Sequence, residues 1–144
     1  MFTTSQPFAS ARSQGFANAY ARVGVETSVN SASAHKLIEL LFNGFIESVT
    51  LARGAMRNRQ IEAKGKAIGR AARIIEEGLK AGLDMEAGGK LAEDLAALYA
   101  YVAIRLTYAN LRNDESVLDE CVRLINPLRE AWISIGPQVE AGNL

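Results

Sequence analysis

Apolar side chains recur every three or four positions in four successive stretches of this 144-residue chain, and this repeat constrains the fold more than any other feature. Such spacing places the apolar residues on one side of an α-helix. The alternation of apolar and polar residues that is typical of strands does not appear at comparable strength. The sequence therefore predicts an all-α protein.

The four stretches predict helices at about residues 33–58, 61–82, 90–112 and 114–135. Ser33 is suited to cap the first helix, Gly82 to end the second, and Asn113 or Asp114 to cap the fourth. Short connections between helices favour antiparallel neighbours. We therefore expect an antiparallel four-helix bundle.

The apolar side of each predicted helix supplies the expected core. In the second helix this side comprises Ile61, Ile68, Ala72, Ile75, Leu79 and Leu83, while Lys64 and the other charged residues lie mostly elsewhere on its circumference. In the fourth helix it comprises Leu118, Cys121, Ile125, Leu128, Trp132 and Ile135. Pro127 lies inside that helix, where proline removes a backbone donor and costs about 3 kcal/mol. We expect a kink or break at residues 123–127.

A chain of this length with 49% hydrophobic residues is expected to form one domain. Residues 1–18 mix Ser, Thr, Gln, Ala and Gly without steady periodicity, which predicts a mobile N-terminal arm. We assign residues 19–136 to the helical bundle and residues 137–144 to a flexible C-terminal tail.

Charge and cysteine usage exclude several classes of function. Lysine plus arginine equals aspartate plus glutamate at 16 each, so no net positive charge attracts nucleic acid. Cys121 is the only cysteine, which excludes an internal disulfide and fits a reducing cytoplasm. We expect no signal peptide and no membrane insertion, because no sufficiently long apolar run is present.

Residues for catalysis or metal binding are scarce. His35 is the only histidine, so one chain contains neither a catalytic triad nor a paired-histidine metal helix. We interpret His35 as a surface residue of a first helical turn and Cys121 as a core residue. Gly88, Gly89 and Lys90 do not satisfy the phosphate-loop pattern. We therefore expect no enzyme activity, no cofactor and no metal site.

The helix predicted at residues 90–112 carries two apolar stripes on opposite sides. One stripe comprises Leu91, Leu95, Leu98, Val102, Leu106 and Ala109, and the other comprises Ala97, Tyr101, Ile104, Tyr108 and Leu111. A simple amphipathic helix has only one such stripe. The second stripe is therefore the most informative part of the sequence.

Two interpretations of the second stripe remain open. The helix could be central, covered by its neighbours and by the N-terminal arm. Alternatively, the stripe could form a groove for an amphipathic helix of a partner. The change Ile104→Asp separates them, because it unfolds a protein that buries Ile104 and abolishes binding by one that exposes it.

The order and spacing of several short motifs resemble the flagellin-specific export chaperones of bacterial flagella, the FliS family. The resemblance covers residues 19–135, and its most extended motifs are Tyr20 with residues 25–27, residues 31–33 leading into 37–44, residues 64–68, residues 98–101, and residues 128–132. Each motif alone has low specificity. Their combination in this order is specific.

The resemblance implies a bundle that binds the disordered C-terminal segment of flagellin in the cytoplasm. It further implies that binding prevents premature polymerisation, and that the loaded chaperone meets a component of the flagellar type III export gate. It adds Tyr20, near the client surface, to the partner-binding residues Ala97, Tyr101, Ile104, Tyr108 and Leu111. Two other hypotheses remain: a structural bundle that self-associates, for example as a homodimer, and a small helical enzyme or metal carrier.

Overall fold

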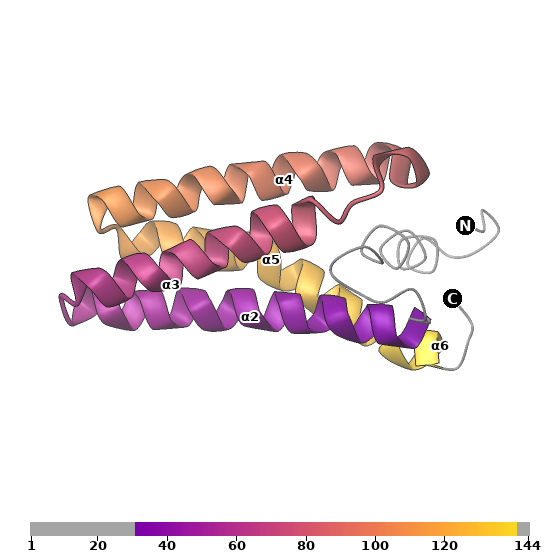
Figure 1. The fold of residues 1–144 in the computed structure, drawn as a ribbon, viewed down its shortest axis with the longest axis horizontal. Helices are drawn as coiled ribbons and strands as arrows, with labels where there is room; N and C mark the ends of the chain where they lie inside the picture. Colours follow the sequence, from indigo (N-terminus) through magenta and orange to yellow (C-terminus); the bar gives the residue numbers. More distant parts are fainter. Residues whose placement is uncertain (1–30, 141–144) are drawn as a thin grey trace.

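The computed structural model describes residues 31–140, and Figure 1 shows its helices. Tyr20 and the predicted arm lie outside the described residues. The elements in chain order are α2 (Ser31–Arg57), α3 (Ile61–Arg73), the π-helix η1 (Ile74–Lys80), α4 (Met85–Arg112), α5 (Glu115–Ser134) and α6 (Gly136–Glu140). Within this part of the chain there is no strand, as the sequence predicts.

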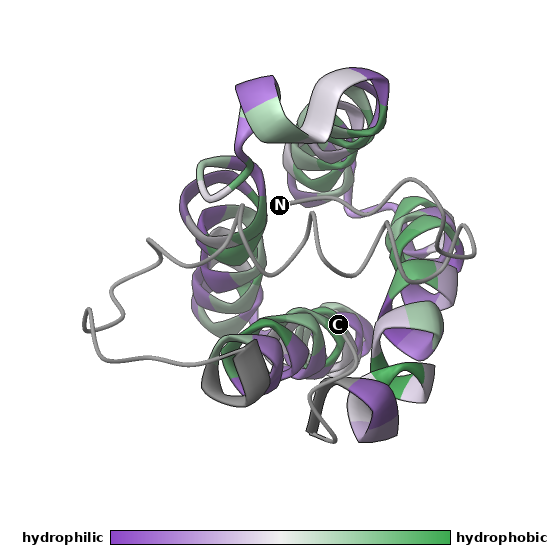
Figure 2. Ribbon diagram, turned by 90° about the vertical axis from the view of Figure 1, so that its right-hand side faces the viewer, coloured by the Kyte–Doolittle hydropathy of each residue, from purple (hydrophilic) through white to green (hydrophobic). Residues whose placement is uncertain are grey.

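Four long helical segments form an antiparallel bundle. Consecutive segments run in opposite directions, with η1 continuing α3 (Figure 1). Viewed end-on in Figure 2, the segments occupy four corners around a common interior. Helix α2 packs against α3 and α5, and α4 packs against α3, η1 and α5. Helices α2 and α4 therefore lie at opposite corners, and each leaves one side outside the bundle.

Aspartate side chains begin two of the helices. Asp84 Oδ1 accepts hydrogen bonds from the backbone nitrogens of Glu86 and Ala87 at 3.1 and 3.0 Å, at the start of α4. Asp114 Oδ1 accepts from the backbone nitrogen of Ser116 at 3.0 Å, at the start of α5. These bonds satisfy backbone donors that a helix start leaves unpaired. Of the two caps predicted for the last long helix, Asp114 is therefore the one used.

The core follows the predicted helical spacing. Its largest fully buried side chains come from all four segments: Trp132, Tyr99, Phe42, Phe45, Ile38, Ile75, Leu79, Leu106, Leu118, Ile125 and Val49. Burial of each large apolar side chain contributes about 1.5–3 kcal/mol. Gly44 permits a close approach between α2 and the start of η1. A Cβ there would lie 3.2 Å from Ile74 Cδ1.

Helix boundaries near residue 85 differ in detail from the prediction. Helical structure ends at Lys80, two residues before Gly82. The predicted connection instead contains the first turn of α4, which Gly89 then interrupts with φ of 54° and ψ of −133°. Only glycine adopts that backbone conformation readily. The regular part of α4 consequently begins after Gly89, where the sequence places it.

Two expectations about positions along the helices are wrong. We expect a kink or break at residues 123–127, and the break is absent, since α5 runs unbroken through Pro127. Pro127 and Arg123 are both exposed, so water can reach the turn in which the hydrogen bond is missing. Ile61, predicted to face the core, is exposed: it is the first residue of α3 and lines an open hollow with Lys64 and Asn113.

His35 is buried, contrary to its interpretation as a surface residue. Its ring stacks on Trp132 with centroids 4.4 Å apart, and Trp132 Nε1 donates to the His35 carbonyl at 2.9 Å. Gly136 packs close by, since a Cβ there would lie 3.3 Å from His35 Nε2. The chain thus turns back over the start of α2 through α6, which lies across the predicted boundary between bundle and tail.

Candidate functional site

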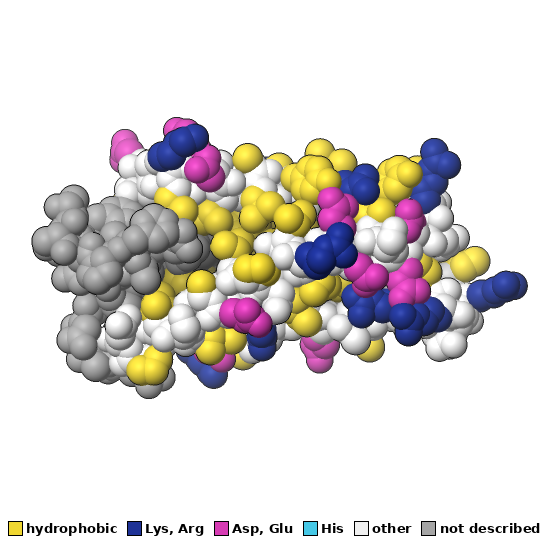
Figure 3. All heavy atoms as spheres, turned by 180° about the vertical axis from the view of Figure 1, so that it is seen from behind, with side chains coloured by type: hydrophobic (Ala, Val, Ile, Leu, Met, Phe, Trp, Pro, Cys, Tyr) yellow, Lys and Arg dark blue, Asp and Glu magenta, His cyan; other side chains and the backbone are white. Residues whose placement is uncertain are grey.

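An apolar strip runs along the outer side of α4. We define it as Ala97, Tyr101, Ile104, Tyr108 and Leu111, the second stripe of the sequence. Ile104 and Leu111 are 67% and 76% exposed, and the rings of Tyr101 and Tyr108 are 43% and 39% exposed. Ala97 is also exposed. Figure 3 shows apolar side chains gathered on this side of the bundle among charged groups.

The opposite side of α4 holds the strip in place. Leu95, Val102, Leu106 and Ala109 are all buried in the bundle. These residues belong to the first stripe, so the two stripes have different environments. Of the interpretations left open by the sequence, the structure agrees with a helix whose second stripe is uncovered by the described residues.

Polar contacts orient the two tyrosines of the strip. The Tyr101 hydroxyl donates to Glu120 on α5, and Arg105 Nε donates to the same carboxylate at 2.9 Å. These two hydrogen bonds lower the pKa of Glu120 below its ordinary value. The Arg105 guanidinium also lies over the Tyr108 ring, 4.8 Å from its centroid. One border of the strip is therefore a linked polar row.

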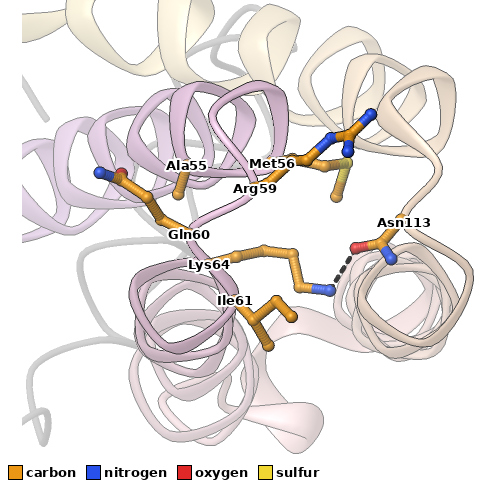
Figure 4. Close-up of a pocket in the computed structure, with 7 residues that line it drawn as sticks. All are labelled: Ala55, Met56, Arg59, Gln60, Ile61, Lys64 and Asn113. Atoms are coloured by element: carbon orange, nitrogen blue, oxygen red, sulfur yellow. Dashed lines mark hydrogen bonds between the residues drawn. The ribbon is translucent and has the colours of Figure 1, made fainter.

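The C-terminal end of α4 is anchored by a buried lysine. Lys64 Nζ on α3 donates to the Asn110 carbonyl at 2.9 Å and to Asn113 Oδ1. Asn113 ends α4 in the left-handed conformation, with φ of 53°. The ammonium thus satisfies an acceptor at the negative end of a helix. Figure 4 shows this contact beside a hollow of about 310 Å³ between the α2–α3 connection and Asn113.

Sequence reasoning missed these supporting residues. The sequence places Lys64 with the charged residues that lie mostly away from the apolar side of its helix, and neither Arg105 nor Glu120 belongs to the predicted site. A partial signal existed for Arg105, which lies four residues after Tyr101 and three before Tyr108 and so shares their side of the helix. The Glu120 contact had no such signal, because it joins two helices.

The described residues contain little that could perform chemistry. Burial raises the pKa of the Cys121 thiol to about 12, so the reactive thiolate is suppressed. Among residues 31–140, no three His, Cys, Asp or Glu side chains gather as metal ligands. No helix in this part of the chain is long and apolar enough to span a membrane.

An all-α bundle that exposes an apolar strip on one helix has the architecture of a protein-binding module. Comparison with known proteins identifies the family. The family model described as Flagellar protein FliS matches residues 16–139. The chain therefore belongs to the FliS family, which is a family of chaperones and not of enzymes.

Curated relatives cover most of the chain. A flagellar secretion chaperone FliS of Salmonella typhimurium is 47% identical over 120 residues, which are 83% of this chain and 89% of the relative. Flagellar secretion chaperone FliSB of Pseudomonas aeruginosa is 45% identical over 116 residues, or 81% of this chain and 91% of the relative. The Bacillus subtilis FliS is 31% identical over 107 residues, or 74% and 78%. The family resemblance seen in the sequence is thereby confirmed.

Proposed function

We propose that this protein is a cytoplasmic export chaperone for flagellin. It binds the disordered C-terminal segment of flagellin, prevents premature polymerisation, and aids delivery to the flagellar type III export apparatus. Relatives named flagellar secretion chaperones support a role in export. The apolar strip on α4 is the single observation that supports a client site on this chain.

The strip suits an amphipathic helix as its client. Tyr101, Ile104, Tyr108 and Leu111 follow one another at spacings of three, four and three residues, which matches the anchor spacing of a helix lying in a groove. The two tyrosines combine apolar ring area with a polar tip at the border. A client with aliphatic anchors every three or four residues would cover them.

Binding of a disordered segment requires the segment to fold on the strip. Ordering such a segment consumes roughly 2–5 kcal/mol of the gross interaction, against burial of about 1,000–3,000 Å². The resulting complex holds its client reversibly, so competition at the export apparatus can release it without a nucleotide. In this proposal the N-terminal arm, with Tyr20, shields the strip until the client displaces it.

A calorimetric titration with a peptide of the flagellin C-terminus tests the proposal. We expect heat of binding and a gain of helical circular dichroism with the natural chain. The change Ile104→Asp should leave the fold intact, because Ile104 is 67% exposed, and should weaken binding on the order of tenfold or more by placing a charge against an apolar anchor.

Leu40→Asp is the matched control, since Leu40 is 55% exposed on α2 and is not part of the strip. It should bind the peptide like the natural chain. Absence of heat and induced helicity with the natural chain would contradict the proposal. An equal loss of peptide binding in Ile104→Asp and Leu40→Asp would mean that the client site is not the strip. The alternative is a structural bundle that self-associates through the strip. Sedimentation at rising protein concentration tests it, because added client should suppress self-association if the protein is a chaperone.

A further inference from the structure

A second surface lies between α2 and α3, apart from the apolar strip. It is a groove of about 610 Å³, which we call the α2–α3 groove. None of its lining residues comes from α4 or α5. Figure 1 shows α2 and α3 side by side along this part of the bundle. A ligand in the groove would therefore contact residues that the proposed client site does not use.

Small side chains on both helices create the groove. Gly54 and Ala55 of α2 face Ala63 and Ala67 of α3. A Cβ added at Gly54 would meet nothing within 4 Å, so space is open above the backbone there. Leu51, which is 61% exposed, forms an apolar wall. The groove therefore accepts a bulky apolar side chain from outside.

The charged residues that line the groove are all basic. Lys66, Arg70 and Arg73 of α3 line it, and no acidic side chain does. They lie at positions i, i+4 and i+7, so they form one row on one side of α3. The row extends about 10 Å along the helix axis, close to two helical turns. Its charges match carboxylates at the same spacing on another helix.

Only the middle residue of this row is engaged. Arg70 Nη1 donates to Ser48 Oγ at 2.6 Å and lies 3.4 Å from Glu47 Oε1, which fixes its position against α2. Within residues 31–140, the side chains of Lys66 and Arg73 take part in no hydrogen bond or ion pair. Two cations that flank an open apolar groove and lack an internal partner are available to an external one.

We propose that the α2–α3 groove docks an acidic amphipathic helix of a partner protein other than the client. One apolar side chain of this helix fills the space above Gly54. Its carboxylates pair with Lys66 and Arg73. The apolar contact supplies affinity. The basic row selects a partner helix that carries negative charge, and it fixes the register in which that helix binds.

The test uses the full chain and a fluorescein-labelled synthetic amphipathic helix that has leucine anchors and glutamates at positions i, i+4 and i+7. Fluorescence anisotropy should show saturable binding, which weakens as salt is raised from about 0.05 to 0.3 M because the pairs are exposed. The same peptide with lysine in place of each glutamate should not bind. Absence of binding by the acidic peptide, or equal binding of both peptides, would overturn the proposal.

Variants at Gly54 locate the site. Gly54→Met fills the groove and should raise Kd on the order of tenfold or more, since the anchor loses its burial. Gly54→Ala is the matched control, because it makes the same backbone change yet leaves the groove open. Alanine and methionine both favour helix more than glycine does, so the melting temperature of each variant should equal or exceed that of the natural chain. Equal affinities of the two variants would overturn the assignment.

Two further variants separate the groove from the strip. The double change Lys66→Glu with Arg73→Glu should weaken binding of the acidic peptide and leave binding of the flagellin peptide unchanged. Ile104→Asp should leave the acidic peptide unaffected, so failure of the client proposal does not decide this one. The groove would not be a separate site if the two peptides competed for binding, or if the Ile104→Asp variant no longer bound the acidic peptide.

Discussion

Lys64 illustrates how a residue's neighbours can reverse what its type suggests. A lysine on an amphipathic helix is ordinarily solvated, yet Lys64 is only 5% exposed and its ammonium binds the end of α4. The acceptors come from residues 46 and 49 positions further along the chain. The helical period of α3 contains no information about them.

Lys64→Met should destabilise the protein by about 1–3 kcal/mol, because it preserves the buried stem but leaves the Asn110 carbonyl and the Asn113 side chain without this donor. Urea unfolding measures the loss. Lys66→Met is the control, since Lys66 is exposed two residues away and should change stability by less than about 0.5 kcal/mol. Equal effects of the two changes would contradict a structural role for the buried ammonium.

Other residues show where single-residue reasoning succeeds and where it does not. Cys121 was predicted to be a core residue from its place in the apolar spacing, and it is fully buried. His35 was wrongly placed at the surface. Its burial depends on Trp132 and Gly136, about a hundred positions later in the chain. Periodicity reports the side of a helix on which a residue lies, but not what folds back over it.

At the scale of elements, α5 tolerates a proline without breaking. The expected break rests on the intrinsic preference of an isolated helix. In the protein, Leu118, Cys121, Ile125 and Trp132 are buried on both sides of Pro127, and this packing keeps the two halves of α5 continuous. Tertiary contacts therefore outweigh the local preference.

Pro127→Ala should stabilise the protein by about 2 kcal/mol. The change restores the backbone donor to the turn that begins at Arg123, and the lost rigidity of the unfolded chain offsets only part of that gain. Thermal and urea unfolding measure the difference. Glu130→Ala, another exposed position of α5, should stay within about 0.5 kcal/mol of the natural chain. A destabilised Pro127→Ala variant would mean that Pro127 does not lower the free energy of unfolding of the natural chain.

Across the whole molecule, carboxylates of α5 join three helices. Glu115 accepts from Arg57 of α2, with Nε to Oε2 at 2.9 Å, and Glu120 accepts from Tyr101 and Arg105 of α4. The hydrogen bond from Arg57 lowers the pKa of Glu115 from its ordinary value of 4.5. Those from Tyr101 and Arg105 likewise lower the pKa of Glu120 from 4.5. Both ionised carboxylates favour the folded state.

The free energy of unfolding should therefore fall as pH drops below 4.5, through the lowered pKa values of the folded state. Protonation in this range favours the unfolded chain, whose carboxylates have the higher pKa. Urea unfolding between about pH 7 and pH 3 measures the slope. Combining Glu115→Gln with Glu120→Gln should reduce this slope, and an unchanged slope would assign the acid sensitivity to other groups.

Most of the fold follows from the sequence, because four amphipathic stretches with short connections leave few ways to bury their apolar sides. The two stripes on one helix were predictable from the same spacing, but the sequence left open whether the second stripe is covered or exposed. Its polar border was not predictable, because Glu120 meets Tyr101 and Arg105 only after α4 and α5 pack. The α2–α3 groove was missed because small residues produce no hydrophobic signal.

Anchoring of α4 by its buried inner side and by its C-terminal end has a thermodynamic consequence. Lys64 binds the last turn of α4, and Leu95, Val102, Leu106 and Ala109 are buried on its inner side, so the strip behaves as a rigid template. Almost all the disorder lost in a complex must then come from the incoming polypeptide. Differences in affinity among incoming polypeptides should therefore follow the intrinsic helix propensity of each polypeptide.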